Sequence, residues 1–418
     1  MGRVLITGMG SLCPLGADTG STFDAALAGR CAIGHAQPDI TKWLPQSLVA
    51  RAAAEPEPLL DKKYASIDRA TQFALVAAQE AMTAANFGTH PQDSERVGVY
   101  AGIGFGGAQT VDALYQRFYS SVAEAANERR NPTVMHPLSV PRMMANAPAA
   151  LVSMHYGLKG PSQTYSVACA SSAVAIGEAF RAIRDGYLDA AVVLGTEAML
   201  TPGSMLAWNA LRVMAKPDPQ DSSRSCRPFA KGRTGFVLGE GGGAIVLESE
   251  ARAQARGQVA LGELCGYGCS SDANHLTAPS TDQQVRAMRQ AIDMADLAPA
   301  QIQYLNAHGT ATEVGDVVET QSIRTAFGAA AAQLMVSSTK AMHGHLIGAS
   351  GIVEFIISVM AMNRGAVPPT ATLDVADPKC DLDYVPLIAR RDCAIEAVMS
   401  NSFAFGGSNV SLVARRYA

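Results

Sequence analysis

The chain has 418 residues, of which 48% are hydrophobic and only 17% are charged. Its net charge of −4 excludes the global basic signature of a nucleic-acid-binding protein. Eight cysteines, in a long chain whose N-terminus lacks the features of a secretory leader, favour reduced thiols and predict a cytoplasmic location. No run of about 18 apolar residues indicates a membrane span.

Apolar, strand-like runs alternate with helical patterns in the first half of the chain, at residues 3–8, 96–104, 190–198 and 243–250. The second half repeats the alternation, with strand-like runs at 259–270, 301–309, 334–340 and 393–407. This alternation predicts an α/β fold with helices on both faces of parallel strands. We place the join in the charged stretch 250–257, which divides the chain into residues 1–252 and 253–418.

Glycine-rich segments invite a nucleotide-binding interpretation that their spacing does not support. The run VLITGMGSLCPLG lacks the third glycine of a dinucleotide motif, and GEGGGAIVLE lacks the lysine and hydroxyl residue of a phosphate loop. Cys265 and Cys269 are wrongly spaced for a zinc knuckle and have no partner pair nearby. We therefore predict neither a metal nor a resident cofactor.

Three sequence motifs contain candidate catalytic residues. Cys169 in VACASSA follows a β-leaning run and precedes a helical pattern, so we expect it at a helix start, where backbone N–H groups stabilise a thiolate. His308 in NAHGTATEVGD closes an apolar run and is expected at a strand end, with Thr310 and Thr312 at the same rim. His345 in STKAMHGHLIGASG lies in a glycine-flanked turn before a long helix. One thiol and two neutral imidazoles predict a catalytic site assembled by folding.

With these motifs, the chain resembles the elongating β-ketoacyl-acyl carrier protein synthases of the thiolase superfamily, particularly the type II bacterial kind. The matching segments are VLITGMGSLCPLG, VACASSA, RPFAKGRTGFVLGEGGGAIVLE, NAHGTATEVGD, STKAMHGH and SNSFAFGGSNVSLV, and the resemblance covers essentially the whole chain. It implies a duplicated five-layer αβαβα fold with two mixed sheets around buried helices. The site would lie between the halves, because the cysteine precedes the join and both histidines follow it.

The resemblance also implies roles for individual residues. Cys169 would hold an acyl group as a thioester, while His308 and His345 would hold the thioester carbonyl of a malonyl unit that loses carbon dioxide. Lys340 and Glu319 match a charged pair that organises the site. The backbone N–H groups of Cys169 and Phe403 would bind the oxyanion, and the Phe403 ring would gate acyl entry. Thr277, Thr310 and Thr312 match positions that contact the phosphopantetheine arm of the substrate in this family.

The resemblance implies acyl carrier protein as a partner. The low charge, the Ala/Gly content and the near-continuous apolar strands predict large buried surfaces and therefore a homodimer, which would form through the segments preceding and containing Cys169. A heterodimer with a ketosynthase-like partner stays open. Two other functions also stay open. One is a catalytically silent chain-length partner, a class of protein that would lack the nucleophilic cysteine. The other is a thiolase, which would carry a second cysteine in place of His345.

The chain departs from the family pattern at five positions: His343 replaces a more usual threonine, Ala404 a glycine, Glu313 a proline, and Ala230 and Thr234 two aspartates. None of these changes removes a catalytic atom. Ala404 and Thr234 could stiffen or reshape loops that relatives use as gates. The pathway, either fatty acid elongation or specialised polyketide or polyene synthesis, therefore stays open, as does the acyl chain length.

Overall fold

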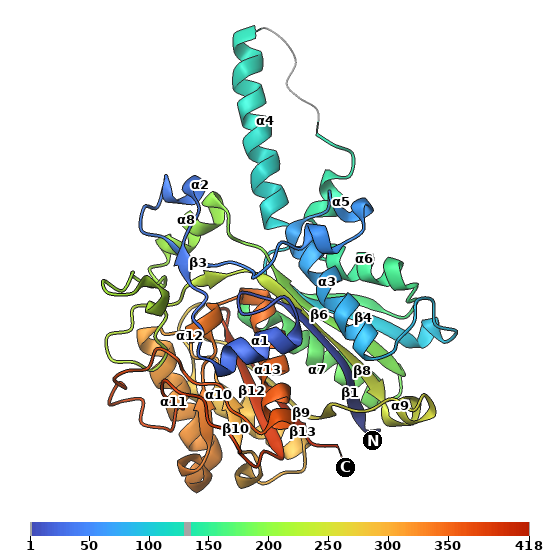
Figure 1. Cartoon of the computed structure of the whole chain (residues 1–418), viewed down its shortest axis with the longest axis vertical. Coiled ribbons are helices and arrows are strands. Elements are labelled where there is room, and N and C mark those ends of the chain that lie inside the picture. The colour runs from blue at the N-terminus through green and yellow to red at the C-terminus, as the bar shows by residue number, and fades with distance from the viewer. Residues whose placement is uncertain (1, 129–134, 418) are drawn as a thin grey trace.

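A computed structural model describes residues 2–128 and 135–417 (Figure 1). Within these residues, ten strands form one mixed sheet. They are β1 Val4–Leu12, β4 Val97–Gly102, β5 Ser162–Tyr165, β6 Ala190–Glu197, β8 Gly241–Ser249, β9 Gly262–Ser271, β10 Tyr304–Asn306, β11 Met335–Ser337, β12 Ala397–Ala404 and β13 Ser408–Arg415. Three short strands form a second sheet: β2 Gly34–His35, β3 Leu48–Ala50 and β7 Leu238–Gly239.

The strand order reveals an internal duplication. The large sheet runs β5-β4-β6-β8-β1 and then, in mirrored order, β9-β13-β12-β10-β11. Corresponding pairs have the same sense: β4 is parallel to both its neighbours, as is β10, while β8 and β13 are antiparallel to theirs. The two five-stranded units join where Val4, Leu5 and Ile6 of β1 pair with β9. The duplicated architecture is therefore confirmed, with the two predicted sheets linked by a short ladder.

Helices complete five layers. The inner layer holds α7 (Ser171–Arg184) and α13 (Ser350–Arg364), which pack on each other and on both sheet units. The outer face of the first unit is covered by α3 (Arg69–Ala84) and α6 (Ala147–Tyr156), and that of the second by α10 (Thr281–Met294) and α11 (Glu313–Phe327). The remaining helices are α1 Thr19–Leu27, α2 Pro38–Thr41, α4 Ala108–Glu128, α5 Ser139–Met143, α8 Pro202–Ala210, α9 Glu250–Ala255 and α12 Lys340–His343. The predicted domain join falls within α9.

The stretch Ile347–Arg364 is long and apolar enough to cross a membrane. Most of it is buried inside the protein, where it includes the inner helix α13. A buried core helix meets the same length and composition criteria as a membrane span. Its position in the core therefore explains why this stretch is so apolar.

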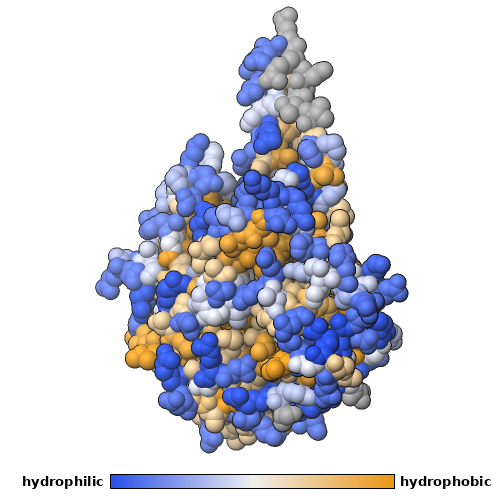
Figure 2. Space-filling view, turned by 45° about the vertical axis from the view of Figure 1, so that its right-hand side comes forward, coloured by the Kyte–Doolittle hydropathy of each residue, from blue (hydrophilic) through white to orange (hydrophobic). Residues whose placement is uncertain are grey.

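Helix α4 projects from the body of the molecule as an arm (Figure 1). It carries exposed aromatic residues, including Tyr115 and Tyr119, and buries only Ser121 and Ala125 among its described residues. Apolar residues also gather where the arm meets the body (Figure 2). An isolated helix gains little stability on its own, so the arm presents a face suited to a partner.

Glycine pairs set the closest contacts between the outer helices and the sheet. In each unit, two glycines of the first strand lie directly against the backbone of the following outer helix. The contacts are Gly8 with Ala81, Gly10 with Ala77, Gly266 with Ala291 and Gly268 with Ala287. A Cβ at Gly268 would lie 1.9 Å from the Ala287 carbonyl oxygen, so no larger residue fits there. The N-terminal glycines that resemble part of a nucleotide motif thus serve helix packing.

Replacement of Gly268 by alanine should destabilise the fold, because α10 must move to admit the new methyl group. We expect a loss of about 1–3 kcal/mol, the usual cost of overpacking. Urea unfolding at fixed protein concentration measures it. The matched control is Gly88→Ala, where a Cβ meets nothing within 4 Å. Equal unfolding midpoints for the two variants would contradict this account of the packing.

Candidate active site

Cys169 lies at a tight junction between strand and helix. The chain leaves β5, enters the 3-10 turn η4 (Ala168–Ala170) and continues directly as α7. Ala168 has a φ of +45°, a left-handed conformation that is costly for a residue with a side chain. The Ser171 hydroxyl fixes the turn, because it accepts the Val167 N–H at 2.9 Å and donates to the Ala168 carbonyl at 2.7 Å. The predicted strand-to-helix setting of Cys169 is confirmed.

The sulfur of Cys169 is buried, and its environment differs from the expected one. Burial raises the pKa of Cys169 to about 12, although the Lys340 ammonium and the Phe405 backbone N–H both favour the thiolate. Burial thus opposes the thiolate that the helix start was expected to stabilise, and neither Lys340 nor the Phe405 N–H offsets it.

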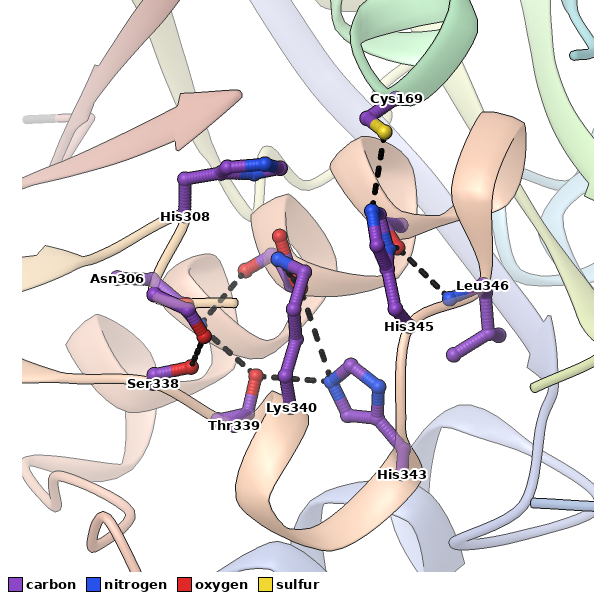
Figure 3. A network of polar contacts seen from close by, with 12 residues as sticks. Cys169, Asn306, His308, Ser338, Thr339, Lys340, His343, His345 and Leu346 are labelled. Atoms are coloured by element: carbon purple, nitrogen blue, oxygen red, sulfur yellow. Dashed lines mark hydrogen bonds and ion pairs between the residues drawn. The ribbon is translucent and has the colours of Figure 1, made fainter. Parts of the chain in front are cut away.

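His345 reaches the sulfur from the second unit. Its backbone is held by bonds with Val237 and Gly239, and its Nε2 lies 3.0 Å from the Cys169 Sγ (Figure 3). The turn η8 (Ile347–Ala349) follows and leads into α13, so His345 lies close to a helix start, as predicted. Ile347 has a φ of +45°, and the Leu346 N–H bonds to the Ser350 hydroxyl at 2.9 Å.

The contacts of His345 determine its tautomer. Its Nδ1 faces the Ile347 N–H at 3.3 Å and the Ser350 hydroxyl at 2.8 Å. A backbone N–H can only donate, so Nδ1 is the acceptor and the proton of the neutral ring is assigned to Nε2. His345 therefore presents an N–H donor to the space beside the sulfur.

His308 follows the end of β10 and faces the same space, as predicted. Its ring lies 5.5 Å from that of His345, measured between centroids. The His308 and Gly309 backbone N–H groups bond to the two carboxylate oxygens of Glu319 at 2.8 and 2.7 Å, which fixes the loop. The His308 Nδ1 is buried and has no hydrogen-bond partner among the described residues. Burial and then the Lys340 ammonium hold the pKa of both imidazoles well below the usual value, so both rings are neutral.

Lys340 is fully buried at the start of α12, and its ion partner differs from the predicted one. The ammonium Nζ lies 2.5 Å from Oε1 of Glu354, on α13. Glu319 instead accepts the two N–H groups of the His308 loop. Burial raises the pKa of Glu319, and Lys340 opposes this shift only through space. The predicted pair of Lys340 with Glu319 is thus corrected to Lys340 with Glu354. Burial raises the pKa of Glu354 to about 7, and Lys340 opposes this.

The two phenylalanines of SNSFAFGGSN have different positions. Phe403 lies within β12, and its ring lies 6.1 Å from that of His308. Phe405 lies just beyond the strand, and its backbone N–H faces the Cys169 sulfur. The assignment of the second oxyanion N–H to Phe403 is corrected to Phe405. The Phe405 ring stacks on Trp208 of α8, at 6.3 Å between centroids.

A cavity of about 460 Å³ opens in front of Cys169, His308 and His345. Its lining includes every predicted site residue except Lys340, namely Cys169, Thr277, His308, Thr310, Thr312, Glu319, His345 and Phe403. The Thr310 and Thr312 hydroxyls lie 3.0 Å apart, and Thr312 also caps α11 by accepting the Gly315 N–H. Thr277 is exposed on the outer loop. A single path thus connects the surface threonines to the buried sulfur.

Cys169, His308 and His345 place one potential metal-ligand atom each within 4.8 Å of one another. This donor set would suit zinc, yet the 3.0 Å between Sγ and Nε2 is a hydrogen-bond distance. A tetrahedral zinc ion would hold sulfur and nitrogen roughly 3.5 Å apart. The Cys169 sulfur and the His345 nitrogen are therefore placed to hydrogen-bond to each other. That the site holds no metal stays a prediction.

The sequence analysis missed four residues that contact or support the site, namely Glu354, Phe405, Trp208 and Glu197. Glu197 accepts the backbone N–H groups of Gly104, Phe105 and Gly348, and burial raises its pKa to about 8. It thereby ties the loop before α4 to the turn after His345. The sequence did hold a signal for Glu354, which is the one carboxylate in the apolar helix IVEFIISVMAM.

Comparisons with known proteins agree with this geometry. The model of the β-ketoacyl synthase N-terminal domain matches residues 1–253, and that of the C-terminal domain matches residues 261–374. The 3-oxoacyl-[acyl-carrier-protein] synthase 2 of Staphylococcus aureus strain COL is 40% identical over 99% of this chain and 98% of its own length.

Two solved structures extend the comparison to the fold. A β-ketoacyl synthase from Burkholderia phymatum STM815 is 34% identical, with a TM-score of 0.88 and full coverage of both chains. A type II polyketide ketosynthase bound to a hexaketide and in complex with its acyl-carrier protein is 26% identical, with a TM-score of 0.89, again over both whole chains.

The raised pKa of Cys169 predicts how its alkylation depends on pH. We expect the rate of modification by iodoacetamide to rise about tenfold per pH unit between about pH 7 and pH 10, because the thiolate fraction is still increasing there. Mass spectrometry with peptide mapping separates Cys169 from the other cysteines, and glutathione serves as the free-thiol reference. A plateau below about pH 9 would mean that Lys340 and the Phe405 N–H outweigh burial.

Proposed function

The chain belongs to the β-ketoacyl synthase family, and we propose that Cys169, His308 and His345 perform its reaction in two half-reactions. The reaction is the decarboxylative Claisen condensation of an acyl group with a malonyl unit on acyl carrier protein, giving a β-ketoacyl thioester in fatty acid or polyketide synthesis. The observation that carries the assignment is the pairing of a buried thiol with two neutral imidazoles, one of them 3.0 Å away.

The first half-reaction is acyl transfer to Cys169. The sulfur attacks the carbonyl carbon of an acyl-carrier thioester, so a new C–S bond forms and the carrier C–S bond breaks. The proton of the Cys169 thiol leaves with the departing carrier thiol. The backbone N–H groups of Cys169 and Phe405 flank the sulfur and would hold the tetrahedral oxyanion.

The second half-reaction begins with decarboxylation. His308 and His345 would donate N–H groups to the thioester carbonyl oxygen of the malonyl unit. As carbon dioxide leaves, its bonding electrons form an enolate whose charge lies on that oxygen, so these bonds strengthen in the transition state. Neutral rings suit the task because each keeps one N–H donor, and Lys340 helps to keep them neutral.

Carbon–carbon bond formation completes the cycle. The enolate carbon attacks the carbonyl of the acyl-Cys169 thioester, and the Cys169 sulfur leaves with the electron pair of the broken C–S bond. His345 Nε2–H, at 3.0 Å, would stabilise the departing thiolate. Uptake of one proton from solvent restores the resting thiol. No resident cofactor takes part in this scheme.

The substrates would arrive on the phosphopantetheine arm of acyl carrier protein. Thr277, Thr310 and Thr312 line the cavity from its mouth inwards, and their hydroxyls suit the amide groups of such an arm. The exposed Arg212 lies on the same lining and would meet the acidic surface of the carrier. All eight cysteines are free thiols, which suits the reducing cytoplasm.

We further propose that the active form is a homodimer. β5 is an edge strand of the large sheet, leads into Cys169 within four residues and leaves Ser162 and Gln163 exposed. Edge strands and apolar arms of this kind are normally covered. A heterodimer with a ketosynthase-like partner is the alternative, and in it this chain would be the active half because it holds the nucleophile.

Separate assays of acylation and decarboxylation test the assignment of roles. Replacement of His308 or His345 by alanine should leave acylation of Cys169 largely intact. Malonyl decarboxylation should fall on the order of a hundredfold to a thousandfold, the usual cost of losing one donor to an oxyanion. Cys169→Gln should abolish condensation and acylation while still releasing carbon dioxide from malonyl-carrier protein. Histidine variants that lose acylation yet decarboxylate normally would assign those rings as bases for Cys169.

Sedimentation at micromolar concentration tests the dimer. We expect a species of twice the 43.6 kDa chain mass. Tyr119→Glu, on the exposed face of α4, should shift it toward monomer, because a buried carboxylate in an apolar interface is costly. Ile388→Glu is the matched control, since Ile388 is 78% exposed and lies in the second unit, away from β5. A fully active monomer of the parent chain would contradict the proposal.

A further inference from the structure

A third histidine lies directly beside the Lys340 ammonium. His343 closes the short helix α12, three residues after Lys340, and is fully buried. Figure 3 shows its ring beside Lys340, on the side away from His308 and Cys169.

The contacts of His343 define its hydrogen bonding. Its Nε2 lies 2.9 Å from the Thr339 hydroxyl, which also accepts the Asn306 side-chain N–H at 3.4 Å. The imidazole and the Thr339 hydroxyl share one hydrogen bond, in which either group can donate, and this bond anchors Thr339, the N-cap residue of α12.

The same nitrogen lies next to the buried ion pair. It is 3.9 Å from the Glu354 oxygen that bonds to the Lys340 ammonium. The imidazole ring is fully buried and fills space beside the pair that a smaller side chain would leave open. An ion pair enclosed by protein atoms exerts a stronger field than one that water can reach.

We propose that His343 is a positioning residue that anchors Thr339 and seals the Lys340–Glu354 ion pair against water, keeping the ammonium fixed and unscreened behind His308 and His345. This inference rests on the proposed function, because it assigns a task to Lys340 in that reaction.

The groups that face this cluster determine the expected pH behaviour. They are Lys340, Glu354, Glu319, His308 and His345. Burial and Lys340 lower the pKa of His343 to about 3, so its ring is neutral at working pH and adds no charge. Lys340 also lowers the pKa of the two catalytic imidazoles, so any screening of its charge should raise their pKa values.

The test measures carbon dioxide release from malonyl-carrier protein against pH, in the Cys169→Gln background so that decarboxylation is isolated. His343→Thr, whose side chain is smaller but keeps a hydroxyl, should admit water beside Lys340. Water would screen the ammonium, so the imidazoles would become protonated at higher pH. We therefore expect the acid limb of the profile to move to higher pH by about one unit, which is the low end of the pKa shift that one nearby charge causes. His343→Gln, whose amide can reach Thr339 and which fills more of the space, should move it by less than half as much.

The controls separate this inference from the proposed function. Thermal melting of each variant checks that it folds, and His308→Ala in the same background must lose most of the carbon dioxide release. If that control fails, the proposed function is wrong. If it succeeds while His343→Thr keeps the parent profile, or His343→Gln shifts it as far as His343→Thr does, the positioning role of His343 is overturned.

Discussion

The site depends on burying one ammonium beside two imidazoles that must stay neutral. Lys340 is enclosed completely, and a charge so placed is tolerated only because Glu354 pairs with it at 2.5 Å. The ammonium and the burial together disfavour protonation of His308 and His345. Each ring therefore keeps an N–H donor without carrying charge of its own. The surrounding fold serves this arrangement, since α12 presents Lys340, α13 supplies its partner and the β10 loop delivers His308.

Much of this arrangement follows from local sequence, because strand ends and helix starts are local features. Cys169 and His308 lie where the periodicity places them. The partner of Lys340 could not be predicted in the same way, since Glu319 and Glu354 both lie on helices and only the packing of α13 decides which carboxylate reaches the ammonium. Phe403 and Phe405 are two residues apart, and the end of β12 between them decides which N–H reaches the sulfur. The high pKa of Cys169 depends on burial depth, a quantity that no short motif contains.

Packing between helices and sheets explains the glycine content better than any ligand does. The glycines of β1 and β9 bring α3 and α10 so close that their carbonyl oxygens occupy the space of a side chain. The three residue pairs between β1 and β9 suffice to join the units edge to edge, while α7 and α13 fill the space between them. The cavity opens at this junction, so no single unit could form the site.

The two turns before α7 and α13 are copies of one structure. Val167 corresponds to Leu346, Ala168 to Ile347 and Ser171 to Ser350, with the same left-handed φ and the same N–H to serine bond in each copy. The counterpart of Cys169 is thus Gly348, where a Cβ would lie 2.4 Å from the Gly104 nitrogen. One of the two turns therefore has room for a side chain at this position and the other does not. The repeated architecture thus provides one thiol at these two turns, because a side chain has room at Cys169 and none at Gly348.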